Sequence, residues 1–178
     1  MWDSATAQEP LAPTLARHAA PDHAAQQSRA NVAAWAAANL AAYTPEPQSA
    51  AVDLLRPADP LDETVATLLY AVTHRPFRGL YDEVSSWSLA RKREVIDAAL
   101  EHRHPREELL REFRSGYAFV FDIVTDIGAY RDLHRHRRCI QIRQPYTTAL
   151  GYETPGLIVE AGLEAPYRQA LEQAGAGD

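Results

Sequence analysis

The amino-acid sequence predicts an α+β fold that is mostly helical. After residue 51, apolar residues recur at helical spacing between residues that start and break helices. One segment, residues 117–124, instead alternates between two faces and is rich in aromatic and β-branched residues, which is typical of a strand. With 178 residues, 46% of them hydrophobic, the chain is long enough for one domain with a core and too short for two large ones.

Residues 1–50 are predicted to be an extension, and residues 51–178 the domain. The extension is dominated by Ala, Gln and Pro, so it can bury little surface against the entropy of ordering, and we expect it to be loosely attached. Residues 22–43 contain neither Pro nor Gly and are rich in Ala, so they should form a helix. Its only large anchors are Val32, Trp35 and Leu40. Residues 44–49 read as a linker.

Helical segments are predicted in the first half of the domain. Asp59 and Pro60 form an N-cap and a first helical position for a helix over 60–73. Ser88 is the expected cap of another helix, which reaches about residue 102. Two shorter helices are expected over 76–84 and 105–113.

The segment 117–124 is interpreted as a largely buried strand. It places Tyr117, Phe119, Phe121 and Ile123 on one face. The sequence after it predicts a helix over 126–138, an extended stretch at 140–143, a turn-rich loop at 150–156 and a last helix over 163–173.

The most unusual stretch of the chain is the cationic segment, residues 131–138, which holds four arginines and two histidines in a protein of net charge −6. On a helix, Arg131, His134, Arg135 and Arg138 would share one stripe and repel each other. A bound di- or triphosphate would convert this repulsion into charge-assisted hydrogen bonds of about 1.5–3 kcal/mol each. The alternative is a solvated helix, or one paired with acids elsewhere such as Glu107 and Glu108.

Other kinds of site are less well supported by the sequence. His134 and His136 point roughly 200° apart on a helix, so they cannot chelate one metal ion, and no metal site is expected. The single cysteine, Cys139, excludes an internal disulfide framework, is expected in the core and favours a cytoplasmic protein. No apolar run approaches the length of a membrane span, so neither a signal peptide nor an anchor is expected.

Nucleic acid is a further candidate ligand. Residues 91–93 and the cationic segment would supply positive charge, and the aromatic side chains of residues 117–121 would stack on bases. The acidic total charge and the usual core role of such strands weigh against this interpretation.

A family resemblance appears at the cationic segment. Phe119, Phe121 and Ile123, followed by Arg131 and then by Arg135-His136-Arg137, resemble the strand–helix unit of the flavin-dependent thymidylate synthases. Downstream, residues 147–155 resemble a divergent bacterial branch of that family. The similarity covers about residues 52–173, and its specific part is 117–155. It implies a small antiparallel sheet, as in the first half of that fold.

The resemblance implies a function. Members of that family bind FAD between the subunits of a homotetramer and convert dUMP to dTMP with methylenetetrahydrofolate and NADPH. By resemblance, Arg135, His136 and Arg137 would bind FAD, and Arg131 would lie near the substrate. Gln141 and Arg143 would supply further substrate contacts.

The sequence also departs from that family. In ungapped register, the positions that grip dUMP are occupied here by Ile140, Ile142, Arg143, Pro145 and Thr147. Three functions therefore stay open. The chain is a flavin-dependent thymidylate synthase-like protein, a noncatalytic assembly module whose arginine-rich helix contacts an acidic surface, or a nucleic-acid-binding domain.

Overall fold

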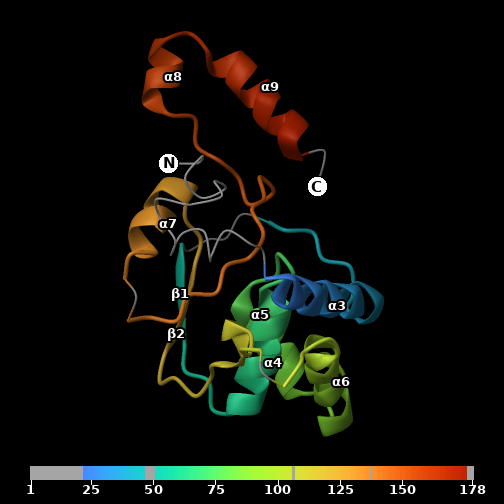
Figure 1. Cartoon of the computed structure of the whole chain (residues 1–178). Helices are drawn as coiled ribbons and strands as arrows, with labels where there is room; N and C mark the ends of the chain where they lie inside the picture. Colours follow the sequence, from blue (N-terminus) through green and yellow to red (C-terminus); the bar gives the residue numbers. More distant parts are fainter. Residues whose placement is uncertain (1–21, 47–50, 106, 137, 176–178) are drawn as a thin grey trace, which may run out of the picture.

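The computed structural model describes residues 22–46, 51–105, 107–136 and 138–175 (Figure 1). Within these ranges the prediction of a mostly helical α+β fold is confirmed, with one small two-stranded antiparallel sheet. The helices are α3 His23–Asn39, α4 Pro60–Tyr70, α5 Phe77–Ser85, α6 Leu89–Leu100, α7 Ile127–Leu133, α8 Gly156–Glu160 and α9 Glu164–Gly175. The strands are β1 Val52–Leu55 and β2 Val120–Ile123, and a 3₁₀ turn covers Arg111–Phe113.

Helix α4 forms the centre of the core and begins where the sequence predicted. The Asp59 carboxylate accepts hydrogen bonds from the N–H groups of Leu61, at 2.7 Å, and Asp62, at 3.2 Å. From Tyr70 the chain turns, so the helix is shorter than the predicted segment 60–73. The side chains that α4 contributes to the core are fully buried and are those of Val65, Leu68 and Leu69.

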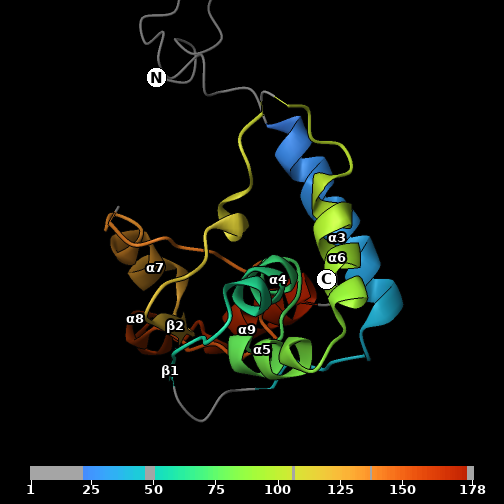
Figure 2. The ribbon, with the colours of Figure 1, turned by 90° about the horizontal axis from the view of Figure 1, so that it is seen from below.

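Helix α3 packs on α6, as both views show (Figures 1 and 2). Val32 and Ala36 are buried, and the Trp35 ring lies 5.7 Å from that of Trp87. The Arg91 guanidinium lies over both rings. The alanine-rich composition of this segment led us to expect a loosely attached helix. In the structure, α3 contributes to the core. The domain division at residue 50 stays a prediction.

The helix predicted over 105–113 is wrong, because the segment is a loop that ends in the 3₁₀ turn. Contacts with distant parts of the chain fix this loop. Glu112, whose side chain is 3% exposed, forms an ion pair of 2.8 Å with Arg29 of α3. The Glu63 carboxylate of α4 accepts the N–H of Gly116 at 2.7 Å, where φ is +86° and favours glycine.

The strand predicted over 117–124 is confirmed only for β2, and β1 was not predicted. The two strands pair antiparallel, with Val52 opposite Ile123 and Leu54 opposite Phe121. Strand β1 has four residues, which is too short for a pattern of alternation to stand out in the sequence.

The structure also differs from the prediction after β2. Helix α7 ends at Leu133, so the predicted helix over 126–138 is too long. Cys139 is exposed and is not part of the core. The stretch 140–143 is not a strand, and α8 lies where a loop was expected to continue. Helix α9 confirms the last predicted helix.

Candidate functional site

The two-stranded sheet turns four of its apolar side chains to the solvent. Successive side chains of a strand point to opposite faces, and in this register four of them form one exposed face. We call it the outer sheet face, and it comprises Val52, Leu54, Phe121 and Ile123, which are 53%, 43%, 58% and 40% exposed. The opposite, inner face carries two acids and also Leu55 and Val120, which pack in the core. Apolar side chains therefore lie on both faces, although an antiparallel sheet normally turns a polar face to the solvent.

The inner face carries two carboxylates, Asp53 and Asp122, because groups on α4 and at the start of α5 form hydrogen bonds with them. Asp122 is buried, and it accepts the Tyr70 hydroxyl at 2.7 Å and the backbone N–H of Phe77 at 2.8 Å. Burial raises the pKa of Tyr70, and the neighbouring Asp122 carboxylate raises it further. These bonds hold β2 against α4 and α5 in one orientation.

Asp53 on β1 points to the same side as Asp122. It accepts two hydrogen bonds of 2.7 Å from the Arg78 guanidinium of α5, and these bonds hold the pKa of the Asp53 carboxyl below its ordinary value. A slip of one residue in the strand pairing would turn Asp53 and Asp122 to the other face of the sheet. Their hydrogen-bond partners Arg78, Tyr70 and Phe77 would then lack an acceptor. The outer sheet face is therefore fixed by the polar contacts of the inner face.

More apolar surface lies next to the outer sheet face along the chain. Phe119 is 49% exposed, and the Arg56 guanidinium carbon lies 4.9 Å from its ring centroid. Ile127, at the start of α7, is 58% exposed. Exposed apolar groups on this scale typically mark an interaction site.

The cationic segment includes the end of α7 and the turn after it. The Gln141 amide donates to the carbonyl oxygens of Leu133, at 2.8 Å, and His136, at 3.2 Å, so it closes the turn after the helix. The Gln141 side-chain oxygen lies 3.2 Å from Nδ1 of His134, whose ring lies against that of Tyr130. Gln141 thus has a local structural contact, and the predicted stripe at helical spacing does not form, because the helix ends first.

The remaining predicted site residues that the structure describes are exposed on the surface, and they are Arg131, Arg135, His136 and Arg143. Arg131, Arg135 and Arg138 are exposed, and Arg135 reaches Asp132 only at 3.8 Å, with both side chains more than three-quarters exposed. Such a pair contributes little to stability. Arg143 stacks on Tyr146 at 4.8 Å. Arg137 lies outside the described residues.

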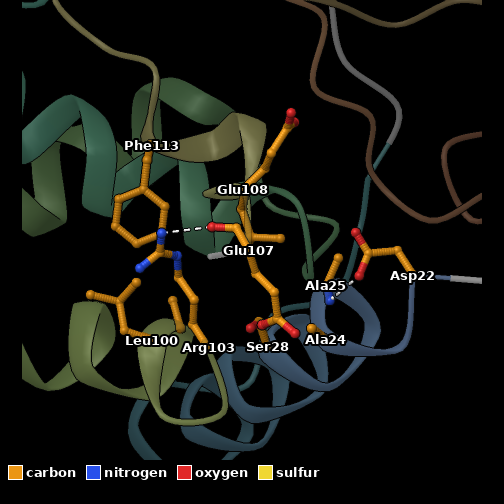
Figure 3. Close-up of a pocket in the computed structure, with 11 residues that line it drawn as sticks. Asp22, Ala24, Ala25, Ser28, Leu100, Arg103, Glu107, Glu108 and Phe113 are labelled. Atoms are coloured by element: carbon orange, nitrogen blue, oxygen red, sulfur yellow. Dashed lines mark hydrogen bonds between the residues drawn. The ribbon is translucent and has the colours of Figure 1, made fainter. Parts of the chain in front are cut away.

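A cavity of about 170 Å³ lies elsewhere, between α3, α6 and the 103–113 loop (Figure 3). Arg103 donates across its wall to the carbonyl oxygen of Glu107 at 2.6 Å, and Asp22 caps α3 at its rim. None of the site residues predicted from the sequence lines this cavity. It is smaller than ordinary ligand sites, which span about 300–1,000 Å³.

Two of the three basic residues at 91–93 are engaged in the fold, and Arg93 is exposed. Arg91 stacks on two tryptophans, and Lys92 is buried with its Nζ atom 2.5 Å from Asp62 Oδ1. Neither side chain is therefore available to line a surface for nucleic acid. Among the described residues, no group of three or more His, Cys, Asp and Glu side chains is placed to hold a metal ion.

Known proteins offer partial similarities. The chain is 54% identical over 56 residues to a UPF0159 protein of Chlamydia muridarum, which covers 32% of this chain and 11% of that protein. It is 30% identical over 116 residues to a UPF0159 protein of Chlamydia pneumoniae, covering 65% and 22%. A UPF0159 protein of Thermoplasma acidophilum is 25% identical over 115 residues, covering 64% and 23%. The chain thus spans less than a quarter of the length of these relatives.

These similarities correct the family interpretation. The relatives carry the name UPF0159, so the resemblance to flavin-dependent thymidylate synthases is wrong, and the dUMP reaction and flavoprotein character that followed from it are withdrawn. The cofactors FAD and NADPH also rested on that resemblance, and they stay untested predictions. The same holds for the ligand roles assigned to six residues, which are Arg131, Arg135, His136, Arg137, Gln141 and Arg143. No model of a known protein family and no solved structure matches the chain. No helix in the described part of the chain is long and apolar enough to span a bilayer.

Proposed function

We propose that this chain is a protein-interaction module that self-associates through its outer sheet face. The observation that carries this proposal is the solvent-exposed apolar face of the sheet. Asp122 faces inward while Phe121 and Ile123 face the solvent. Each large apolar side chain contributes about 1.5–3 kcal/mol when fully buried, so covering the half-exposed members of this face is favourable.

A second copy suits this face for two reasons. A two-stranded sheet is marginal by itself, and more strands or a packed helix stabilise it. The charges are also complementary. The cationic segment begins eight residues after the end of β2, whereas the chain as a whole has a net charge of −6, so an identical copy carries an excess of acidic groups that can pair with it.

The test is a measurement of mass in solution by analytical ultracentrifugation. The variant Leu54→Gln/Phe121→Gln removes apolar surface from the outer sheet face without adding charge. The matched control is Leu89→Gln/Leu109→Gln, because each of these leucines is 52% exposed and lies on α6 or the following loop. We expect a dimer or larger assembly for the wild type and the control, and a shift to monomer for the sheet variant.

The outcome that contradicts the proposal is equally clear. A wild-type chain that stays monomeric at concentrations up to about 1 mM, where an association of only about 4 kcal/mol would show, rules out self-association. So does an unchanged assembly in the sheet variant, provided that its circular dichroism shows the same helical content as the wild type.

A further inference from the structure

The C-terminal arm, residues 151–175, is a second exposed apolar surface in the part of the chain that the structure describes. Its helices α8 and α9 contact each other, and they lie away from the group formed by α3, α4, α5 and α6 (Figure 1). Leu157 is 77% exposed, and Val159 and Leu163 are each 50% exposed. Helix α8 has five residues, and so short a helix is not stable without packing.

The charge of the arm is opposite to that of the chain beside the outer sheet face. The arm contains four glutamates and one arginine, Arg168, which already pairs with Glu164 at 2.8 Å. Exposed arginines lie on the chain after each strand. Arg56 directly follows β1, and Arg131, Arg135 and Arg138 come eight to fifteen residues after β2. An acidic apolar arm and an apolar sheet that is followed along the chain by exposed arginines are complementary in both respects.

The linker before the arm is fixed to the body of the molecule. The Gln144 amide donates to the carbonyl oxygen of Arg75 at 2.8 Å, next to the start of α5. From this point the chain runs to α8 and α9, which in Figure 1 lie at the far end from α4 and α6. The arm thus begins seven residues after a point that is bonded to the body, and its apolar side chains Leu157, Val159 and Leu163 are exposed.

We infer that the C-terminal arm of one copy packs on the outer sheet face of a second copy. This inference rests on the self-association proposed above and names the segment that the sheet face binds. Since every copy carries one arm and one sheet face, a two-fold dimer exchanges two identical contacts. Leu157 and Val159 would cover Leu54 and Phe121, with the glutamates of the arm against the arginines that follow the two strands.

The experiment compares three variants of the full chain. They are the sheet variant Leu54→Gln/Phe121→Gln, the arm variant Leu157→Gln/Val159→Gln and the control Leu89→Gln/Leu109→Gln. We expect the sheet and arm variants each to weaken dimerisation by about tenfold or more, and the control to leave it unchanged. A mixture of the sheet and arm variants should form more dimer than either alone, since the mixed dimer keeps one intact contact.

The results separate the two proposals. If the sheet variant dissociates and the arm variant dimerises like the wild type, the arm inference is overturned while self-association through the sheet stands. If neither variant weakens the dimer, both are overturned. Equal weakening by both variants, with no gain on mixing, also overturns the exchange of arms.

A cross-linking experiment tests whether the contact joins two copies. In a Cys139→Ser background, one chain carries Phe121→Cys and another carries Val159→Cys, and the two are mixed under mild oxidation. We expect a disulfide-linked pair to form about tenfold faster than in a matched mixture with Leu89→Cys in place of Phe121→Cys, because a disulfide needs Cβ atoms about 4 Å apart. Equal rates in the two mixtures overturn the inference.

Discussion

The Tyr70 hydroxyl donates a hydrogen bond of 2.7 Å to the Asp122 carboxylate, and this bond joins the central helix to the strand that bears the outer sheet face. The other carboxylate oxygen accepts the Phe77 N–H at 2.8 Å. One buried acid thus orients β2 against both α4 and α5, and Phe121 and Ile123 of β2 point outward as a result.

The first prediction concerns Asp122. Replacing it with Ala leaves the Tyr70 hydroxyl and the Phe77 N–H without their acceptor, and each lost bond to a charged group costs about 1.5–3 kcal/mol. We expect Asp122→Ala to lower the free energy of unfolding by about 3 kcal/mol in urea denaturation, and Tyr70→Phe by about 1.5 kcal/mol. A loss in Asp122→Ala no greater than that in Tyr70→Phe would show that the bond to Phe77 contributes nothing.

The second prediction concerns alkaline pH. Burial and the Asp122 carboxylate raise the pKa of Tyr70 above the ordinary value of 10.0. The stability that this shift provides is fully present below pH 10.0 and is lost as pH rises through the range above it, because only the unfolded chain ionises there. Ultraviolet titration of tyrosinate should find one tyrosine that ionises only on unfolding, and the Tyr70→Phe variant should lack it. A full tyrosine count that ionises without unfolding contradicts the prediction.

The third prediction concerns the ion pair of Lys92 and Asp62, whose side chains are 11% and 9% exposed. Removing one partner leaves the other charge buried, which costs about 3–5 kcal/mol. We expect Lys92→Met to lower the free energy of unfolding by that amount, and Lys92→Met/Asp62→Leu to recover most of it. Losses that simply add in this double-mutant cycle would show that the two residues do not interact.

The fourth prediction concerns the start of α7. The Asp126 carboxylate accepts the N–H groups of Gly128, at 2.7 Å, and Ala129, at 3.0 Å, and these bonds lower its pKa from the ordinary 3.8. The cap therefore stabilises α7 above about pH 4, and its contribution is lost as pH falls through the lowered pKa of the folded state. The amide resonances of residues 128 and 129 should shift together with a midpoint below 3.8. A midpoint at or above 3.8, or amides that do not respond, contradicts the cap.

The sequence contains the local signals of this fold and lacks the signals that decide its surface. Asp59 and Ser88 are predicted as helix caps and act as such in the structure, because a cap depends on residues two or three positions away. Pro105 and Glu107 also indicate a helix start, but the pairing of Glu112 with Arg29 fixes a loop there. Arg29 lies 83 residues from Glu112 in the sequence, so no local pattern around Glu112 indicates this contact.

The same reason explains why the strand was expected to be buried. The alternation of Phe119, Phe121 and Ile123 gives the period of the strand correctly, and it cannot say which face points inward. That choice depends on the bonds that Asp122 forms with Tyr70 and Phe77, 52 and 45 residues away. The acid Asp122 within an otherwise apolar strand is a sequence signal that its face is the one that needs polar partners.

The last prediction concerns the cationic segment. If its arginines attract the acidic arm of a second copy, the triple variant Arg131→Ser/Arg135→Ser/Arg138→Ser should slow association and make it less sensitive to salt, since exposed charges act over about 8–10 Å at ordinary ionic strength. A suitable control is Arg93→Ser/Arg114→Ser, because both side chains are exposed and lie outside the cationic segment. Stopped-flow mixing of differently labelled chains at low and high salt measures the effect.

We expect the rate constant of association of the wild type and the control to fall with added salt, and that of the triple variant to start low and change little. A triple variant with the salt dependence of the wild type excludes the cationic segment from the interface, because its charges would then have no part in bringing the two copies together.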